Sequence, residues 1–116
     1  MVDCHGVAGT TKAGKYLQQL CKHFAHKVPA IYDEASGRVE FPVGLCLMTA
    51  DEQELTFFCR ADQTEGLQIM QVIIDNHLKR FAWREALETD WRPGLPGSLP
   101  DVVADGFAST SGSRSD

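Results

Sequence analysis

The sequence has 116 residues, 43% of them hydrophobic and 23% charged, so it can form one domain with its own core and is not of the disordered class. Its 16 acidic residues outnumber 11 basic ones, which argues against binding to nucleic acid because that binding depends on clustered Lys and Arg. No run approaches the roughly 20 apolar residues of a membrane-spanning helix, and the first residues lack a signal-peptide pattern. A cytoplasmic protein without membrane contact is therefore expected.

The first 61 residues are predicted to contain one helix among several strands. Pro29 ends the helix, since the residue before a proline avoids helical geometry, and Thr10 or Thr11 would be its N-cap. The predicted elements are a short extended segment (4–9), the helix (12–27), a β hairpin (30–33 and 38–41) and two further strands (45–50 and 55–61).

A second helix is predicted to run to about Arg84 from Asp62-Gln63-Thr64-Glu65, which resembles a capping box with an acid in place of the hydroxyl. A final strand is expected over residues 86–91. The domain would then span residues 1–94, and the Gly-, Ser- and Pro-rich residues 95–116 would form a flexible tail.

This order of elements predicts an α+β fold, in which two helices pack on one face of an antiparallel sheet. A ferredoxin-like layout and a TATA-binding-protein-like layout would both fit.

The four cysteines show neither a Cys-x-x-Cys pair nor the spacing of a zinc ribbon. In the cytosol such thiols stay reduced. Cys46 and Cys59 lie within apolar strand patterns, so we interpret them as small buried hydrophobic residues.

The histidine-rich end of the first helix is the first feature that could carry chemistry. Helical spacing places Gln19, His23 and His26 together beside the apolar stripe. The two histidines are three residues apart, so their rings could converge on one metal ion or ligand. Cys21 lies about 160° from His23 around the helix, which makes Cys21-x-His23-x-x-His26 a poor three-ligand motif.

His77 falls within the apolar face of the second helix, where it needs a hydrogen-bond partner. One interpretation is a core histidine satisfied by a backbone carbonyl or a carboxylate. The other pairs His77 with His23 or His26 across the helix–helix seam, giving two or three imidazoles that could bind zinc, iron or copper. Arg80 and Arg84 follow along one edge of the same helix and could hold an anionic group.

No nucleophile elbow and no glycine-rich phosphate loop is present, so a non-catalytic domain is favoured over an enzyme. Trp83 falls outside the apolar stripe of the second helix. An aromatic residue in such a place either lies under a terminal strand or marks a dimer or partner surface.

Two sequence blocks, Tyr16 to Lys27 and His77 to Glu85, together with Asp90-Trp91, resemble the bacterial family labelled domain of unknown function 2218. The resemblance spans about residues 5–92, and no activity is established for the family. Similar domains are sometimes joined to siderophore-interacting flavin reductases. The resemblance thus implies a role near iron acquisition, with a siderophore-utilisation flavin reductase as partner.

Two hypotheses follow. In the first, the domain binds a metal or an iron ligand: His23, His26 and His77 hold a transition metal ion, while Gln19, Arg80 and Arg84 contact the ligand. In the second, the domain is a non-catalytic interaction or dimerisation module, a homodimer in which the histidines are structural.

Overall fold

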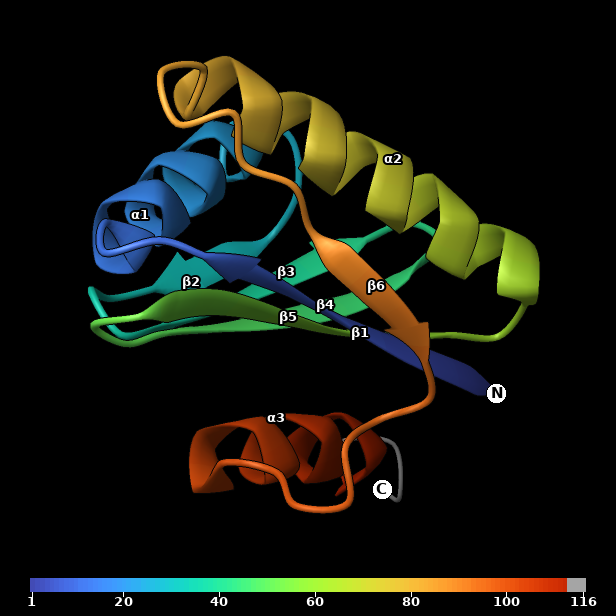
Figure 1. Ribbon diagram of the computed structural model, residues 1–116. Coiled ribbons are helices and arrows are strands. Elements are labelled where there is room, and N and C mark those ends of the chain that lie inside the picture. The colour runs from blue at the N-terminus through green and yellow to red at the C-terminus, as the bar shows by residue number, and fades with distance from the viewer. Residues whose placement is uncertain (113–116) are drawn as a thin grey trace.

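The strands and helices predicted from the sequence form in the predicted order, and a third helix follows them (Figure 1). The structure is a computed structural model that describes residues 1–112, with side chains to residue 108. Its elements are β1 (Val2–Gly9), α1 (Ala13–Phe24), β2 (Ala30–Tyr32), β3 (Ser36–Phe41), β4 (Gly44–Ala50), β5 (Glu54–Ala61), α2 (Thr64–Phe81), β6 (Asp90–Pro93) and α3 (Asp101–Gly112).

The strands form one six-stranded antiparallel sheet in the order β2-β3-β4-β5-β1-β6. The α+β class and the antiparallel sheet are thus confirmed. Four strands lie between α1 and α2, whereas a ferredoxin-like fold has two strands there. This count removes the ferredoxin-like alternative and leaves the TATA-binding-protein-like one.

Helices α1 and α2 lie side by side on one face of the sheet (Figure 1), which we call the inner face. The apolar stripe predicted for α1 is buried there, and Cys21 joins it with its sulfur 3.8 Å from that of Met48. The predicted burial of Cys46 and Cys59 is confirmed: both are fully buried, and they are directly opposite each other on β4 and β5.

The ends of the helices differ from the sequence prediction. The N-caps are Lys12 for α1 and Gln63 for α2, and neither side chain makes a capping hydrogen bond, so both predicted caps are wrong. The final strand lies at residues 90–93 instead of 86–91. The chain first makes a turn after α2, in which Ala86 has a φ of 49°.

Residues 101–112 form α3 where the sequence predicted a flexible tail, so that prediction needs correction. The helix lies on the opposite face of the sheet from α1 and α2 (Figure 1), which we call the outer face. A helix this short, with several Gly and Ser residues, is not stable alone, but an apolar patch on the outer face supplies the surface that it packs on. Residues 113–116 of the predicted tail lie outside the described residues.

None of the helices within residues 1–112 combines the length and the apolar character that crossing a membrane requires.

Candidate functional site

The C-terminal ends of α1 and α2 bring two of the predicted site residues together. The ring centroids of His23 and His77 are 4.7 Å apart, with the ring planes inclined at 52°. Two phenylalanines pack around them. The ring centroid of Phe24 is 5.0 Å from that of His77, and the ring centroid of Phe81 is 6.0 Å from that of His23. Both histidines are partly buried. We call this pair and its surroundings the histidine seam.

His77 also has the backbone hydrogen bond that the structural interpretation requires. Its Nδ1 lies 2.7 Å from the carbonyl oxygen of Ile73, one turn earlier in α2, and donates its proton to that oxygen. This hydrogen bond uses Nδ1 and leaves Nε2 as the ring nitrogen that can meet another partner. Histidines that bind metals have the same arrangement, because their second ring nitrogen usually donates to a carbonyl or a carboxylate. The hydrogen bond is therefore consistent both with a structural histidine and with a metal ligand at position 77.

His26 does not complete a three-histidine site. Among the described residues, no group of three or more His, Cys, Asp or Glu side chains is placed to hold a metal ion. Helix α1 ends at Phe24 and the chain turns over residues 25–27, so the helical spacing that placed His26 beside His23 no longer applies. His26 is exposed. Within residues 1–112 the structure thus brings two of the three predicted histidines together, His23 and His77.

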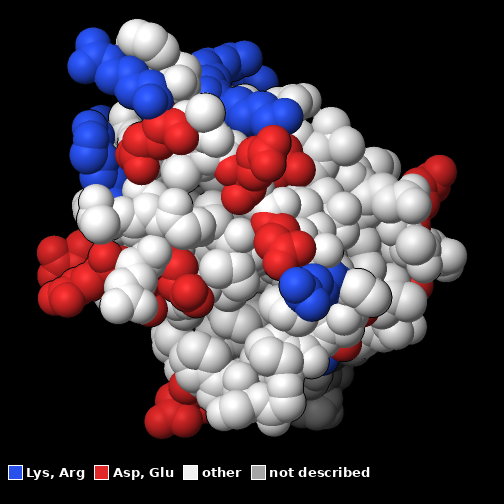
Figure 2. Space-filling model, in the orientation of Figure 1, with Lys and Arg blue, Asp and Glu red and all other residues white. Residues whose placement is uncertain are grey.

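Burial first, and then the positive charges of nearby groups, hold the pKa of His23 below its ordinary value. These groups are His77, Lys27, Arg80 and His26, all of them basic. Figure 2 shows Lys and Arg side chains gathered at the upper left, over the end of α2 and the neighbouring α1, with Asp and Glu side chains next to them. At His23 itself the charged groups that lower the pKa are all basic, which favours an anionic ligand there.

The remaining predicted ligand-binding residues differ in their surroundings. The Oε1 atom of Gln19, one helical turn before His23, is buried and has no hydrogen-bond partner among the described residues. Arg80 is exposed and lies one turn after His77 in α2. The guanidinium of Arg84 instead lies over the ring of Trp83, 4.9 Å from its centroid. Gln19 and Arg80 thus flank the seam, whereas Arg84 is engaged with a neighbouring side chain.

Glu85 forms a polar cluster that the sequence analysis missed. Thr10 donates a 2.8 Å hydrogen bond to one carboxylate oxygen, and Tyr16 donates a short one to the other. These bonds lower the pKa of Glu85 and raise that of Tyr16 to about 12. The signal in the sequence was Tyr16 itself, because the hydroxyl of a buried tyrosine needs a partner. The cluster fastens the segment after α2 to α1 and so helps to position the seam.

Cys21 faces the sheet instead of the seam, as its position on the helix had indicated. Its sulfur lies against that of Met48, and burial raises the pKa of its thiol to about 12.

The fold and the seam together define a small α+β domain with one antiparallel sheet and a pair of imidazoles between its two inner helices. The chain belongs to the family described as an uncharacterized protein conserved in bacteria (DUF2218), whose model matches residues 5–92. The resemblance seen in the sequence is thereby confirmed.

The fold is also similar to the NMR structure of PA4090 from Pseudomonas aeruginosa. The two chains are 27% identical with a TM-score of 0.70, and the alignment covers 83% of this chain and all of that one. The comparison with curated proteins gives no match.

Proposed function

We propose that this domain binds a small anionic metal chelate, such as a ferric carboxylate complex, at the histidine seam. The observation that carries the proposal is the 4.7 Å pairing of His23 with His77, next to the basic groups Lys27, Arg80 and His26. In this arrangement the two imidazoles bind the metal, and the chelate's own oxygens fill the remaining coordination positions.

Both imidazoles are suited to act as metal ligands. The hydrogen bond to Ile73 leaves His77 Nε2 free, and the lowered pKa of His23 keeps that ring neutral near pH 7. Ring centroids 4.7 Å apart leave room for both imidazoles to bind one ion as neighbouring ligands through metal–nitrogen bonds of roughly 2.0–2.1 Å. The other ligands of the metal would come from the chelate.

The charge of the surroundings supports a chelate over a bare cation. A free divalent ion would be repelled by Lys27 and Arg80, whereas the carboxylates of a chelate would be attracted. Arg80 can form two parallel hydrogen bonds to one carboxylate, and the side chain of Gln19 offers a further polar group. In this proposal the domain works in the cytoplasm beside a siderophore-utilisation flavin reductase.

Calorimetric titration with ferric citrate, with citrate alone and with zinc chloride tests the proposal. We expect ferric citrate to bind with a Kd below about 100 μM, and H23Q and H77Q each to weaken this at least tenfold. The matched control is H26Q, which removes an exposed histidine just beyond the same helix and should retain wild-type affinity. Circular dichroism confirms that each variant is folded. Ferric citrate binding that survives in H23Q would contradict the proposal, as would no binding by the wild type.

The second hypothesis, an interaction or dimerisation module, has its own observation. Three large apolar side chains on or just after α2 are exposed: Ile69 by 40%, Val72 by 59% and Trp83 by 69%. In this proposal they form a homodimer contact, and the histidines are structural. Sedimentation velocity over a wide concentration range tests this, and a strict monomer at the highest concentration would rule out self-association.

A further inference from the structure

The outer face of the sheet carries a second, smaller apolar cluster, formed between β4, β5 and α3. Val103 and Phe107 of α3 are buried in it, 1% and 5% exposed. They are four residues apart and so lie on one side of the helix. The sheet contributes Leu45, Leu47 and Phe58, and Leu95 and Leu99 of the preceding segment pack against the cluster.

The contact has the form of a helix seated in a groove. Gly106 lets the helix backbone come close to the sheet, because a Cβ atom there would lie 2.8 Å from Cδ1 of Leu47. Arg38 donates a 2.9 Å hydrogen bond to the carbonyl oxygen of Gly106. The guanidinium of Arg60 lies over the ring of Phe107, 4.3 Å from its centroid. Two arginines of the sheet thus hold the helix beside its apolar anchor.

The groove is larger than α3. A cavity of about 680 Å³ lies between α3 and the β2–β3 hairpin, where it is lined by Arg38 and Asp105, among others. Another of about 320 Å³ lies towards Met1, and its lining includes Arg60 and Phe107. The helix therefore covers part of a surface that extends on both of its sides.

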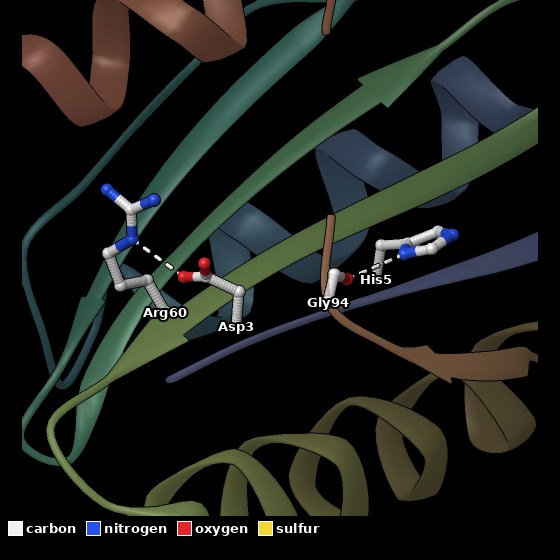
Figure 3. A network of polar contacts seen from close by, with 4 residues as sticks. All are labelled: Asp3, His5, Arg60 and Gly94. Carbon is white, nitrogen blue, oxygen red and sulfur yellow. Dashed lines mark hydrogen bonds and ion pairs between the residues drawn. The ribbon is translucent and has the colours of Figure 1, made fainter. Parts of the chain in front are cut away.

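The covering helix lies beyond the part of the chain that defines the family. The family model matches residues 5–92, whereas α3 begins at Asp101. Figure 3 shows how the sheet is fixed where the linker begins: His5 bonds to the Gly94 carbonyl oxygen at 2.8 Å, and Arg60 pairs with Asp3 at 2.7 Å. The chain up to Gly94 is held in this way without α3, and a Gly- and Pro-containing linker follows.

From these contacts we propose that the outer face is a docking site for an amphipathic helix of a partner protein, and that α3 occupies this site within the chain. The partner helix would present an aliphatic and an aromatic residue four apart, as Val103 and Phe107 do. Its backbone carbonyl and its aromatic ring would meet Arg38 and Arg60, the two arginines that hold α3 in the same way. This inference concerns the face opposite the histidine seam and is independent of the function proposed there.

A synthetic, fluorescein-labelled peptide of residues 95–112 serves as the probe. In the wild type, the tethered α3 competes at an effective concentration on the order of mM, so a peptide Kd of about 10 μM would be weakened about 100-fold. The full-length variant F107D places a charge in the apolar cluster and frees the groove. We therefore expect it to bind the peptide at least tenfold more tightly than the wild type, measured by fluorescence anisotropy.

The matched control is A104D, which changes an exposed residue of the same helix outside both cavities and should behave as the wild type. Equal binding by the wild type and F107D would overturn the proposal, as would a folded F107D that binds no peptide or binds a scrambled one equally well. Sedimentation should give one peptide per chain, and a variant that instead pairs with a second copy would also count against it.

A second measurement covers the case that F107D fails to fold. A protease site inserted after Gly97 in the full chain allows α3 to be cut from its tether without a change in the groove. After cleavage we expect the labelled peptide to replace the cut helix in a 1:1 complex. A cleaved chain that takes up no peptide would overturn the proposal.

Discussion

The two faces of the sheet are covered in different ways, although the same strands form both. On the inner face α1 and α2 share a cluster of twenty buried residues, whereas on the outer face α3 shares a cluster of five, among the described residues. Burial of apolar area is the main stabilising contribution, so the inner face dominates the stability of the fold. The outer face is a shallower contact, of the kind that opens locally at a lower free energy than global unfolding.

This difference assigns different roles to the faces. The inner face can hold a fixed arrangement such as the histidine seam, because both helices that carry it are fastened to the core. On the outer face α3 can be replaced by another helix, because its loss leaves the larger apolar cluster of the inner face intact. Substitutions that remove one large side chain from either face test this contrast directly.

The largest effect is expected for Phe57→Ala. Phe57 is fully buried on the inner face and stacks on Trp91 at 5.7 Å. Its truncation leaves a cavity and should lower the free energy of unfolding by about 3–5 kcal/mol, measured by urea denaturation. An equal change for Phe57→Ala and Phe107→Ala would remove the contrast between the faces.

A smaller effect is expected for Phe107→Ala on the outer face. The substitution removes the aromatic anchor of α3 and its contact with Arg60, and we expect a loss of about 1–2 kcal/mol. Hydrogen exchange should become faster in α3 and remain slow in α1 and β5. The control is Val102→Ala, an exposed position on α3, which should leave exchange unchanged. Faster exchange throughout the sheet would show that α3 is part of the global folding unit.

The polar cluster at Glu85 predicts a pH dependence of the inner face. The pKa of Glu85 is lowered in the folded chain, so its stabilising effect is present above the ordinary glutamate pKa of about 4.3 and is lost as the pH falls through the folded value. Glu85→Gln should lower the Tm by a few degrees at pH 7, and the difference from the wild type should shrink at pH 3. The exposed Glu88→Gln is the control. A difference that stays constant from pH 7 to pH 3 would contradict this assignment.

The sequence predicted the inner face far better than the outer one, and the reason is physical. The apolar stripes of α1 and α2 follow the helical period, which predicts a buried face for each helix, and Leu17 and Met70 on these faces are fully buried. For the histidine seam, the predicted meeting of His23 and His77 is seen in the structure. His26 lies beyond the end of α1, and where a helix ends depends on tertiary contacts that the sequence pattern does not reveal. Helix α3 has only Val103 and Phe107 as buried anchors, too few to recognise without the surface that they cover.

The smallest and most local test concerns the pKa of His23, which should lie below the ordinary histidine value of about 6.5 in an NMR titration. Burial is the largest cause and the basic neighbours come next, so Arg80→Gln should raise the pKa only part of the way to that value. Lys22→Gln, on the same helix, is the control and should leave the pKa unchanged.

The lowered pKa of His23 also makes the stability of the fold depend on pH. The unfolded chain takes up a proton at His23 near pH 6.5, whereas the folded chain does so only at lower pH. Acidification between the two values therefore favours unfolding.

A bound anion would reverse the charge effect on His23, because its negative charge stabilises the protonated ring. If ferric citrate binds through the carboxylate-holding Arg80 alone, the pKa of His23 should rise on binding. If His23 itself binds the metal, its titration should disappear instead, because a proton and a metal ion compete for the same nitrogen.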